Sequence, residues 1–162
     1  MMTRKTRLFP SLGLMLAATL VLAGCGSSSE PQTVTLEKLG ITLDLPANWT
    51  YAEEVSDVRG LLAELRHDGR RTMTIMPDDE VIDNFEAMKS ALAAGSNVTI
   101  TDEETFDNGF GFRYTEHDDE LFLYHIKVGD RTYQFTANRY YYDPEDIPAA
   151  IGIAKSARPA GS

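Results

Sequence analysis

The fold of this chain is decided by the stretch Gly40-Ile41-Thr42-Leu43-Asp44-Leu45-Pro46-Ala47-Asn48-Trp49. Its first half alternates apolar and polar side chains, which is typical of a strand with one buried face. Pro46 ends that strand, and Trp49, the only tryptophan of the chain, is large enough to anchor a core. Residues 33–36 show the same alternation, with Leu39-Gly40 as a turn, so we predict an opening β-hairpin.

A second hairpin is predicted around Asp68-Gly69, because Asp-Gly between two apolar runs is a strong hairpin signal. The two runs are residues 61–66 and 71–76. A helix over residues 53–66 is the competing interpretation, since four apolar residues in it keep helical spacing. Gly60 interrupts that spacing, and the turn chemistry favours strands.

Two helices are expected, one before and one after a four-stranded meander. Carboxylates are stabilised at the positive end of the helix dipole, so Pro77-Asp78-Asp79-Glu80 is placed at the start of a helix that runs to Ala94 and stops at Gly95. Asp143 as N-cap and Pro144 at the first helical position open the last helix. The buried stripes are expected to be Val81, Phe85, Met88 and Leu92 in the first helix, and Ile147, Ala150, Ile151 and Ala154 in the last.

The meander is predicted from four runs, residues 98–106, 111–117, 121–128 and 131–140, joined at Asn108-Gly109, Asp118-Asp119 and Gly129-Asp130. A turn at Asp118-Asp119 would place His125 opposite Phe112. One face is expected to be core and collects Phe122, Tyr124, Ile126, Val128, Tyr133, Phe135 and Ala137. The other face is mixed polar and expected to be solvated or partly covered by a helix; it collects Tyr114, Glu116, Leu121, Leu123, His125, Lys127, Thr132, Gln134, Thr136 and Asn138.

The amino terminus has the pattern of a secretion signal. A short basic segment precedes the apolar residues 8–23, which are 16 residues long where a membrane-spanning helix needs about 20. The signal closes with Leu22-Ala23-Gly24-Cys25, which resembles the bacterial lipobox. That resemblance implies acylation of the Cys25 thiol and cleavage before it; an ordinary signal peptide with a chance cysteine is the alternative.

The expected organisation follows from these boundaries. Residues 1–24 are a cleaved signal, residues 25–32 are the lipidated cysteine and a small, polar tether, residues 33–158 are one domain, and residues 159–162 are a free tail. Acylation consumes the only cysteine, which leaves the domain without a disulfide or a thiolate nucleophile.

Charge excludes several classes of partner. Residues 1–24 hold three of the 15 Lys and Arg residues and no acid, so 12 basic residues face 25 acidic ones after cleavage, a formal charge of −13. Nucleic acids and anionic lipids select clustered Lys and Arg, so neither is an expected partner.

No motif for catalysis or metal binding emerges from the residue types. The three histidines, His67, His117 and His125, are dispersed by the predicted strand pairing, so we expect no metal site from them. The acidic clusters lack the spacing of a calcium loop, although a weak calcium site built from two loops remains open. The serines stand in no nucleophile motif, and there is no glycine-rich phosphate loop, so we expect neither an enzyme nor a cofactor.

The order of elements and two marks resemble the PsbP-like superfamily. Residues 40–49 look like its opening signature, in which an aliphatic strand runs into a Pro and then a Trp. Residues 151–158, with Ser156 and Arg158 after an aliphatic stripe, are similar to its closing helix. The superfamily includes PsbP, the Ran-binding Mog family and bacterial lipoproteins of the DcrB and LpqN types. The resemblance implies an α+β, three-layer α/β/α sandwich around a largely antiparallel sheet, and a binding or assembly role without a shared active site.

The expected function is therefore a lipid-anchored cell-envelope protein that binds or helps assemble an envelope partner, without enzymatic activity. It would sit outside the cytoplasmic membrane, on the periplasmic side of the outer membrane in a Gram-negative host. The candidate binding surface comprises Tyr114, His125 and Gln134 on the polar sheet face, with Tyr141 of the run Tyr140-Tyr141-Tyr142 as a second contact. The alternatives are a small-ligand-binding lipoprotein that uses the polar face, and an enzyme of unfamiliar type.

Overall fold

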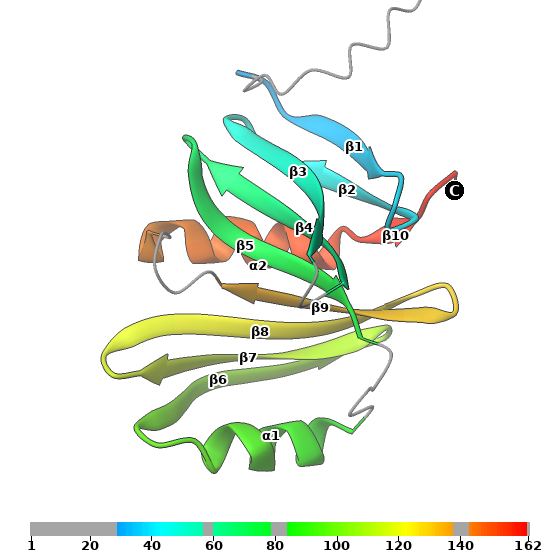
Figure 1. The fold of residues 1–162 in the computed structure, drawn as a ribbon. Coiled ribbons are helices and arrows are strands. Elements are labelled where there is room, and N and C mark those ends of the chain that lie inside the picture. Colours follow the sequence, from blue (N-terminus) through cyan, green and yellow to red (C-terminus); the bar gives the residue numbers. More distant parts are fainter. Residues whose placement is uncertain (1–28, 57–59, 79–83, 138–142, 162) are drawn as a thin grey trace, which may run out of the picture.

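The computed structural model describes residues 29–56, 60–78, 84–137 and 143–161 of the chain. These residues fold into two sheets, two α-helices and a short 3-10 helix (Figure 1). The strands are β1 (Gln32–Leu36), β2 (Ile41–Leu45), β3 (Trp49–Ser56), β4 (Gly60–His67), β5 (Arg70–Pro77), β6 (Val98–Phe106), β7 (Gly109–Glu116), β8 (Asp119–Val128), β9 (Arg131–Ala137) and β10 (Arg158–Pro159). The helices are α1 (Phe85–Ala93), η1 (Pro144–Asp146) and α2 (Ile147–Lys155).

The elements stack in layers around the larger sheet. That sheet is antiparallel throughout and has the order β3-β4-β5-β9-β8-β7-β6. Helix α1 lies against the β6, β7 and β8 end of one face, while α2 and the small sheet β1-β2-β10 pack on the other (Figure 1). The α+β, three-layer architecture expected from the sequence is confirmed.

The opening hairpin forms as predicted. Strands β1 and β2 pair from Gln32↔Leu45 to Leu36↔Ile41, and the turn between them needs a left-handed residue at Gly40, whose φ is 73°. Trp49 then starts β3 with 1% of its surface exposed. Its ring stacks on that of its cross-strand partner His67, with centroids 5.3 Å apart. Trp49 therefore packs the start of β3, the first strand of the large sheet, against the main core.

The segment after Trp49 is a strand, β3, which the sequence analysis did not predict; a helix over residues 53–66 is its less favoured alternative. That helix is wrong: β3 pairs with β4 along its whole length, from Trp49↔His67 to Ser56↔Gly60. Tertiary pairing overrides the helical spacing of the apolar residues, and two of them, Leu62 and Leu65, are buried on β4 instead. The hairpin of β4 and β5 around Asp68-Gly69 is confirmed.

The meander has the predicted strands, but its first two turns each lie one residue before the predicted position. The β7–β8 turn falls on His117 and Asp118, with φ values of 52° and 70°, one residue before the predicted position. Asp and His both tolerate this left-handed conformation. Each residue of β8 consequently faces a residue two positions earlier on β7 than predicted, and His125 lies opposite Phe110 rather than Phe112. A shift of two residues preserves the faces, so the predicted core face is correct.

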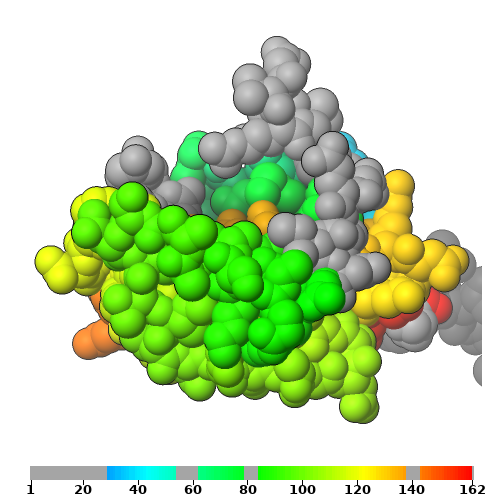
Figure 2. All heavy atoms as spheres, turned by 90° about the horizontal axis from the view of Figure 1, so that it is seen from below, coloured from blue at the N-terminus to red at the C-terminus, as the bar shows by residue number. Residues whose placement is uncertain are grey.

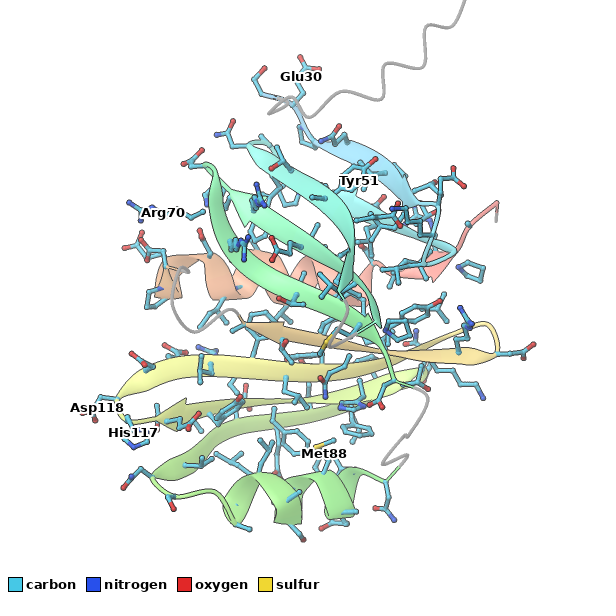
Figure 3. The ribbon with its side chains drawn as sticks, in the orientation of Figure 1. Glu30, Tyr51, Arg70, Met88, His117 and Asp118 are labelled. Atoms are coloured by element: carbon cyan, nitrogen blue, oxygen red, sulfur yellow. The ribbon has the colours of Figure 1, made fainter. Side chains whose placement is uncertain are left out.

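Helix α1 begins later than predicted. Pro77 is the last residue of β5, and the helix starts at Phe85, where the Asn84 side chain accepts hydrogen bonds from the first-turn N–H groups. Asp79, Glu80 and Val81 lie outside the described residues. Met88 points from α1 toward the sheet (Figure 3), where a second core cluster forms. That cluster consists of Met88, Phe110, Phe112 and Leu123, with Phe85, Leu92, Ile100 and Tyr114 packed against it.

Helix α2 is the centre of the main core. Asp143 caps η1 as predicted, accepting from the Glu145 N–H, and α2 continues from it. The fully buried positions of α2 are Ile147, Ala150, Ile153 and Ala154, whereas Ile151, predicted to be in the stripe, is only partly buried. Strands of both sheets pack against this helix.

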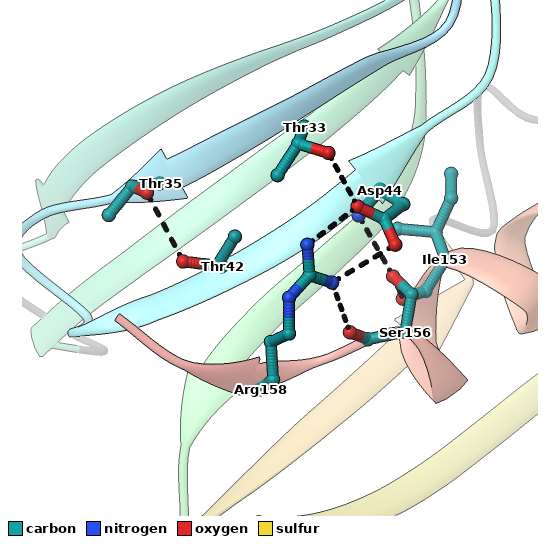
Figure 4. Close-up of polar contacts among 7 residues, drawn as sticks. All are labelled: Thr33, Thr35, Thr42, Asp44, Ile153, Ser156 and Arg158. Carbon is teal, nitrogen blue, oxygen red and sulfur yellow. Dashed lines mark hydrogen bonds and ion pairs between the residues drawn. The ribbon is translucent and has the colours of Figure 1, made fainter. Parts of the chain in front are cut away.

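The end of the chain is not a free tail. Arg158 and Pro159 form β10, which pairs with β2, and the Ala160 N–H donates to the Gly40 carbonyl over 3.0 Å. Arg158 donates to both carboxylate oxygens of Asp44, at 3.0 and 2.8 Å, and the Asp44 N–H donates to Ser156 Oγ (Figure 4). The two stretches that resemble the PsbP-like signatures, residues 40–49 and 151–158, are therefore in contact. Asp44 and Arg158 are 114 positions apart, and no local sequence pattern predicts their contact.

Within the described residues, no helix has both the length and the apolar character needed to cross a membrane.

Replacing Trp49 by Ala should lower the free energy of unfolding by about 3–5 kcal/mol, because a large buried side chain is lost and a cavity remains. Chemical denaturation of both proteins measures the difference. Lys38→Ala, at an exposed turn position, is the control and should melt within about a degree of the wild type. A Trp49→Ala protein as stable as this control would show that Trp49 is not a core anchor.

Candidate functional site

The polar face of the sheet centres on His125 in β8, which is buried with 2% of its surface exposed. It lies directly opposite Gln134 on β9, with 3.3 Å between Gln134 Nε2 and His125 Nε2. Its other neighbour is Phe110, whose ring stacks on the imidazole at a centroid distance of 5.2 Å. His125 and Gln134, two residues of the predicted surface, are therefore in contact, but His125 is part of the protein interior rather than solvated.

Asp78 completes this arrangement. Its Oδ2 is 3.3 Å from His125 Nδ1, and its backbone N–H donates to the Thr132 carbonyl over 2.9 Å. In the neutral tautomer whose Nε2 accepts from Gln134, the imidazole proton is on Nδ1, the ring nitrogen nearer the Asp78 carboxylate. The sequence analysis missed Asp78 in this role because an acid after Pro77 has the pattern of a helix start.

A pocket of about 260 Å³ opens beside His125. We call it the His125 pocket; its lining comprises Asp107, Asn108, Gly109, Phe110, His125, Lys127 and Thr132. The turn that forms one wall is clamped to β8, since the Lys127 N–H donates to the Asn108 carbonyl over 2.7 Å and Asn108 Nδ2 donates to the Lys127 carbonyl over 3.2 Å. Both walls are thus built on paired backbone.

Gly109 allows β7 and β8 to approach each other closely beside the pocket. A Cβ at this position would stand 2.1 Å from the His125 carbonyl oxygen, a distance that real Cβ atoms do not reach. The sequence analysis predicted the turn at Asn108-Gly109; the turn lies at Asp107-Asn108, and Gly109 is the first residue of β7. Here the glycine serves the close approach of two strands.

The remaining predicted residues do not join this pocket. Tyr114 lies opposite Leu121, four residues along β7 from Phe110, and packs against the cluster under α1. Tyr141 and Cys25 lie outside the described residues. The structure therefore brings together His125 and Gln134, and separates Tyr114 from them.

The three histidines occupy separate surroundings. His67 Nδ1 is 2.7 Å from Asp146 Oδ1 beneath Trp49, and His117 Nε2 is 3.0 Å from Asn97 Nδ2 at the far end of the meander (Figure 3). His125 is held by Asp78 and Gln134. Across the described ranges, no three His, Cys, Asp or Glu side chains gather in a metal-binding group.

A polar cluster on the opposite face of the meander was not predicted. Glu104 of β6 accepts from the Tyr124 hydroxyl and, over 2.6 Å, from Lys155 Nζ at the end of α2. Burial raises the pKa of the Glu104 carboxyl, but these two hydrogen bonds outweigh it and the pKa is lowered. Burial and the neighbouring carboxylate raise the pKa of Tyr124. The bond from Lys155 to Glu104 connects the end of α2 to β6, an edge strand of the large sheet.

Comparison with known proteins identifies the fold. No protein-family model and no curated protein matches the sequence. The solution structure of cyanobacterial PsbP (CyanoP) from Synechocystis sp. PCC 6803 is similar, with a TM-score of 0.50 and 11% sequence identity over 85% of this chain and 98% of that chain. The chain has a PsbP-like fold. The likeness confirms the expected fold and covers nearly the whole of the PsbP structure.

Chelator treatment should leave the melting temperature of the purified protein unchanged, because the histidines are dispersed and four carboxylates, those of Asp44, Glu64, Glu104 and Glu120, are paired with Arg or Lys rather than gathered around a metal. Differential scanning calorimetry with and without EDTA measures this, and EGTA tests the weak calcium site left open by the acidic loops. A fall of several degrees, or zinc retained stoichiometrically after dialysis, would contradict the expectation and reopen hydrolytic functions.

Proposed function

We propose that this chain is a lipid-anchored cell-envelope protein with a non-enzymatic binding or assembly role toward an envelope partner. One observation carries the proposal: the first strand of the domain starts at Gln32, seven residues after Cys25. The six residues between them belong to the predicted tether, and a flexible chain of that length would give a root-mean-square reach of roughly 13 Å. An anchor at Cys25 would hold the domain close to the bilayer, where an envelope partner is encountered.

The use of polar side chains supports binding over catalysis. His67 with Asp146, Arg158 with Asp44, and Glu104 with Lys155 join elements that are distant in sequence. Groups of this kind often carry acid–base chemistry, but here each connects two parts of the fold. The PsbP-like superfamily includes bacterial lipoproteins of the DcrB and LpqN types, and as part of the proposal we assign the chain to them, because a lipobox-like segment precedes a PsbP-like fold.

The location follows from the lipobox-like residues. Acylation at Cys25 would keep the domain outside the cytoplasmic membrane. Gly26 follows the cysteine, whereas Asp at that position is the usual inner-membrane retention mark in enteric-type bacteria. In a host with two membranes, the protein would therefore reach the outer membrane and face the periplasm.

The His125 pocket favours a second candidate function, that of a small-ligand-binding lipoprotein. Its volume of about 260 Å³ suits a small molecule, and its lining combines the apolar Phe110 with the polar Lys127 and Thr132. An enzyme of unfamiliar type would use the same pocket, and activity toward any substrate that is lost in His125→Ala and retained in Tyr114→Phe would support it.

Changing Cys25 to Ser should yield uncleaved precursor, because the thiol is the proposed acylation site and cleavage follows acylation. The wild type should incorporate a fatty-acid analogue, and the variant, which lacks the thiol, should not. Mass spectrometry of both proteins from the native host measures processing. Equal cleavage of the two proteins, with no label in either, would exclude the lipoprotein assignment.

Photo-crosslinking in the native host tests the binding role. A crosslinking residue at exposed Asn108, on the pocket rim, or at Thr33, beside the tether, should capture one envelope protein in the wild-type background. Cys25→Ser, which lacks the anchor, is the control and should capture much less. If neither position captures a protein while native mass spectrometry shows a bound small molecule, the second candidate function replaces the first.

A further inference from the structure

The exposed strand edges of this protein differ in how they are protected. Edge strands carry unpaired backbone groups, and proteins usually guard them with charges, bulges or proline. In the large sheet, β3 carries the charged Glu53, and β6 carries three consecutive acids, residues 102–104, with a register shift beside them. In the small sheet, β10 has two residues and ends in Pro159.

Strand β1 has none of these protections. Its sequence, Gln-Thr-Val-Thr-Leu, contains no charge and no proline, and its pairing with β2 is regular over all five residues. It forms one edge of the three-stranded sheet. Val34 and Leu36 point into the core, while Thr33 and Thr35 are on the outer face. Among the edge strands described, β1 is the one with regular pairing and no charged residue.

The hydrogen bonds of β2 show which backbone groups of β1 face outward. In an antiparallel pair, every second residue turns its N–H and C=O away from the partner strand. Asp44, opposite Thr33, gives its N–H to Ser156 Oγ on the other side of β2, 2.9 Å away (Figure 4). The Thr33–Asp44 pair is therefore not bonded across the hairpin, and by alternation neither is Thr35–Thr42. The N–H and C=O groups of Thr33 and Thr35 point to the open edge.

A shallow recess adjoins this edge. It has a volume of about 560 Å³ and is lined by Pro31, Gln32, Thr33, Asp44, Leu45 and Pro46. A strand added beside β1 would place alternate side chains on this outer side. The recess can accept one of them, while the backbone of Thr33 and Thr35 supplies the hydrogen bonds. Main-chain bonds with a pocket for alternate side chains are the two components of strand addition.

The charges near the edge favour a basic occupant. Exposed Glu30 and Glu37 stand at the two ends of β1, and the mature chain carries a formal charge of −13. Lys38 is in the turn, and Arg158 is occupied by Asp44. Pairing with a second copy of the chain would bring two such acidic domains together, which like-charge repulsion opposes.

We propose that β1 is a docking edge for an extended segment of the envelope partner, which adds as a fourth strand to the sheet β1-β2-β10. The segment spans about five residues rich in β-branched side chains and is flanked by Lys or Arg. This inference rests on the proposed binding function and names the surface and the partner chemistry. Because β1 directly follows the tether, the segment belongs to a part of the partner near the membrane.

The test uses the full chain in detergent and a fluorescent probe peptide, Lys-Thr-Val-Thr-Val-Thr-Lys. Thr35→Pro removes an outward N–H while leaving the β1–β2 bonds in place, a position where edge strands tolerate proline. We expect the peptide to bind the wild type and to bind Thr35→Pro about tenfold or more weakly, with Thr35→Val within about twofold of the wild type. A glutamate-flanked peptide should bind more weakly than the lysine-flanked one.

Peptide-induced NMR shifts at the amides of Thr33 and Thr35 should accompany binding. If Thr35→Pro fails to fold, Thr33→Pro, closer to the strand start, serves the same test. Equal binding by the proline variant, shifts confined to β3 or β6, or a wild-type dimer in sedimentation equilibrium that Thr35→Pro dissociates would each overturn the inference. Partner capture in the host that is unaffected by Thr35→Pro would overturn it and leave the proposed function standing. Peptide binding without any captured partner would overturn the proposed function alone.

Discussion

Both sheets depend on the burial of one helix, α2. Its stripe Ile147, Ala150, Ile153 and Ala154 is fully enclosed between β2 of the small sheet and β8 of the large one. The two alanines keep that stripe narrow, so the sheets can approach the helix from two directions, and the isoleucines fill the remaining space. Without α2, each sheet would expose an apolar face to water, at a cost of about 1.5–3 kcal/mol for each large side chain uncovered. The three-layer architecture is a consequence of this shared burial.

The sequence was sufficient for the parts of the fold that local chemistry determines. Alternation and turn residues predicted the hairpins and the core face of the meander, because side chains on a strand change sides every residue. These local patterns failed where contacts with residues distant in the sequence determine the structure. Strand β3 has no clear alternation and is fixed by its pairing with β4, and β10 exists because β2 offers an edge and Asp44 holds Arg158. The displaced β7–β8 turn reflects a choice between adjacent residues that all tolerate left-handed backbone.

The candidate site was predictable only in part for the same reason. The face shared by His125 and Gln134 follows from strand alternation, but the burial of His125 requires Phe110 beside it and Asp78 from another strand's end. Neither contact leaves a signature in the sequence. The PsbP-like fold does not supply the missing information, since a fold is a scaffold on which unrelated sites are built. The polar groups of this chain, rather than its topology, are the basis for any functional argument.

The position of β1 also determines how the domain would respond to mechanical load. The proposed tether precedes Gln32, which pairs with Leu45 at the open end of the hairpin, far from the turn at Gly40. If the chain is anchored at Cys25 as proposed, a pull through the anchor would peel β1 from β2 one pair at a time, the geometry in which strands separate at low force. Strand β2 is better secured, because β10 and the Asp44–Arg158 ion pair hold its other side. Under such a load, β1 would separate from β2 before the core around α2 is disturbed.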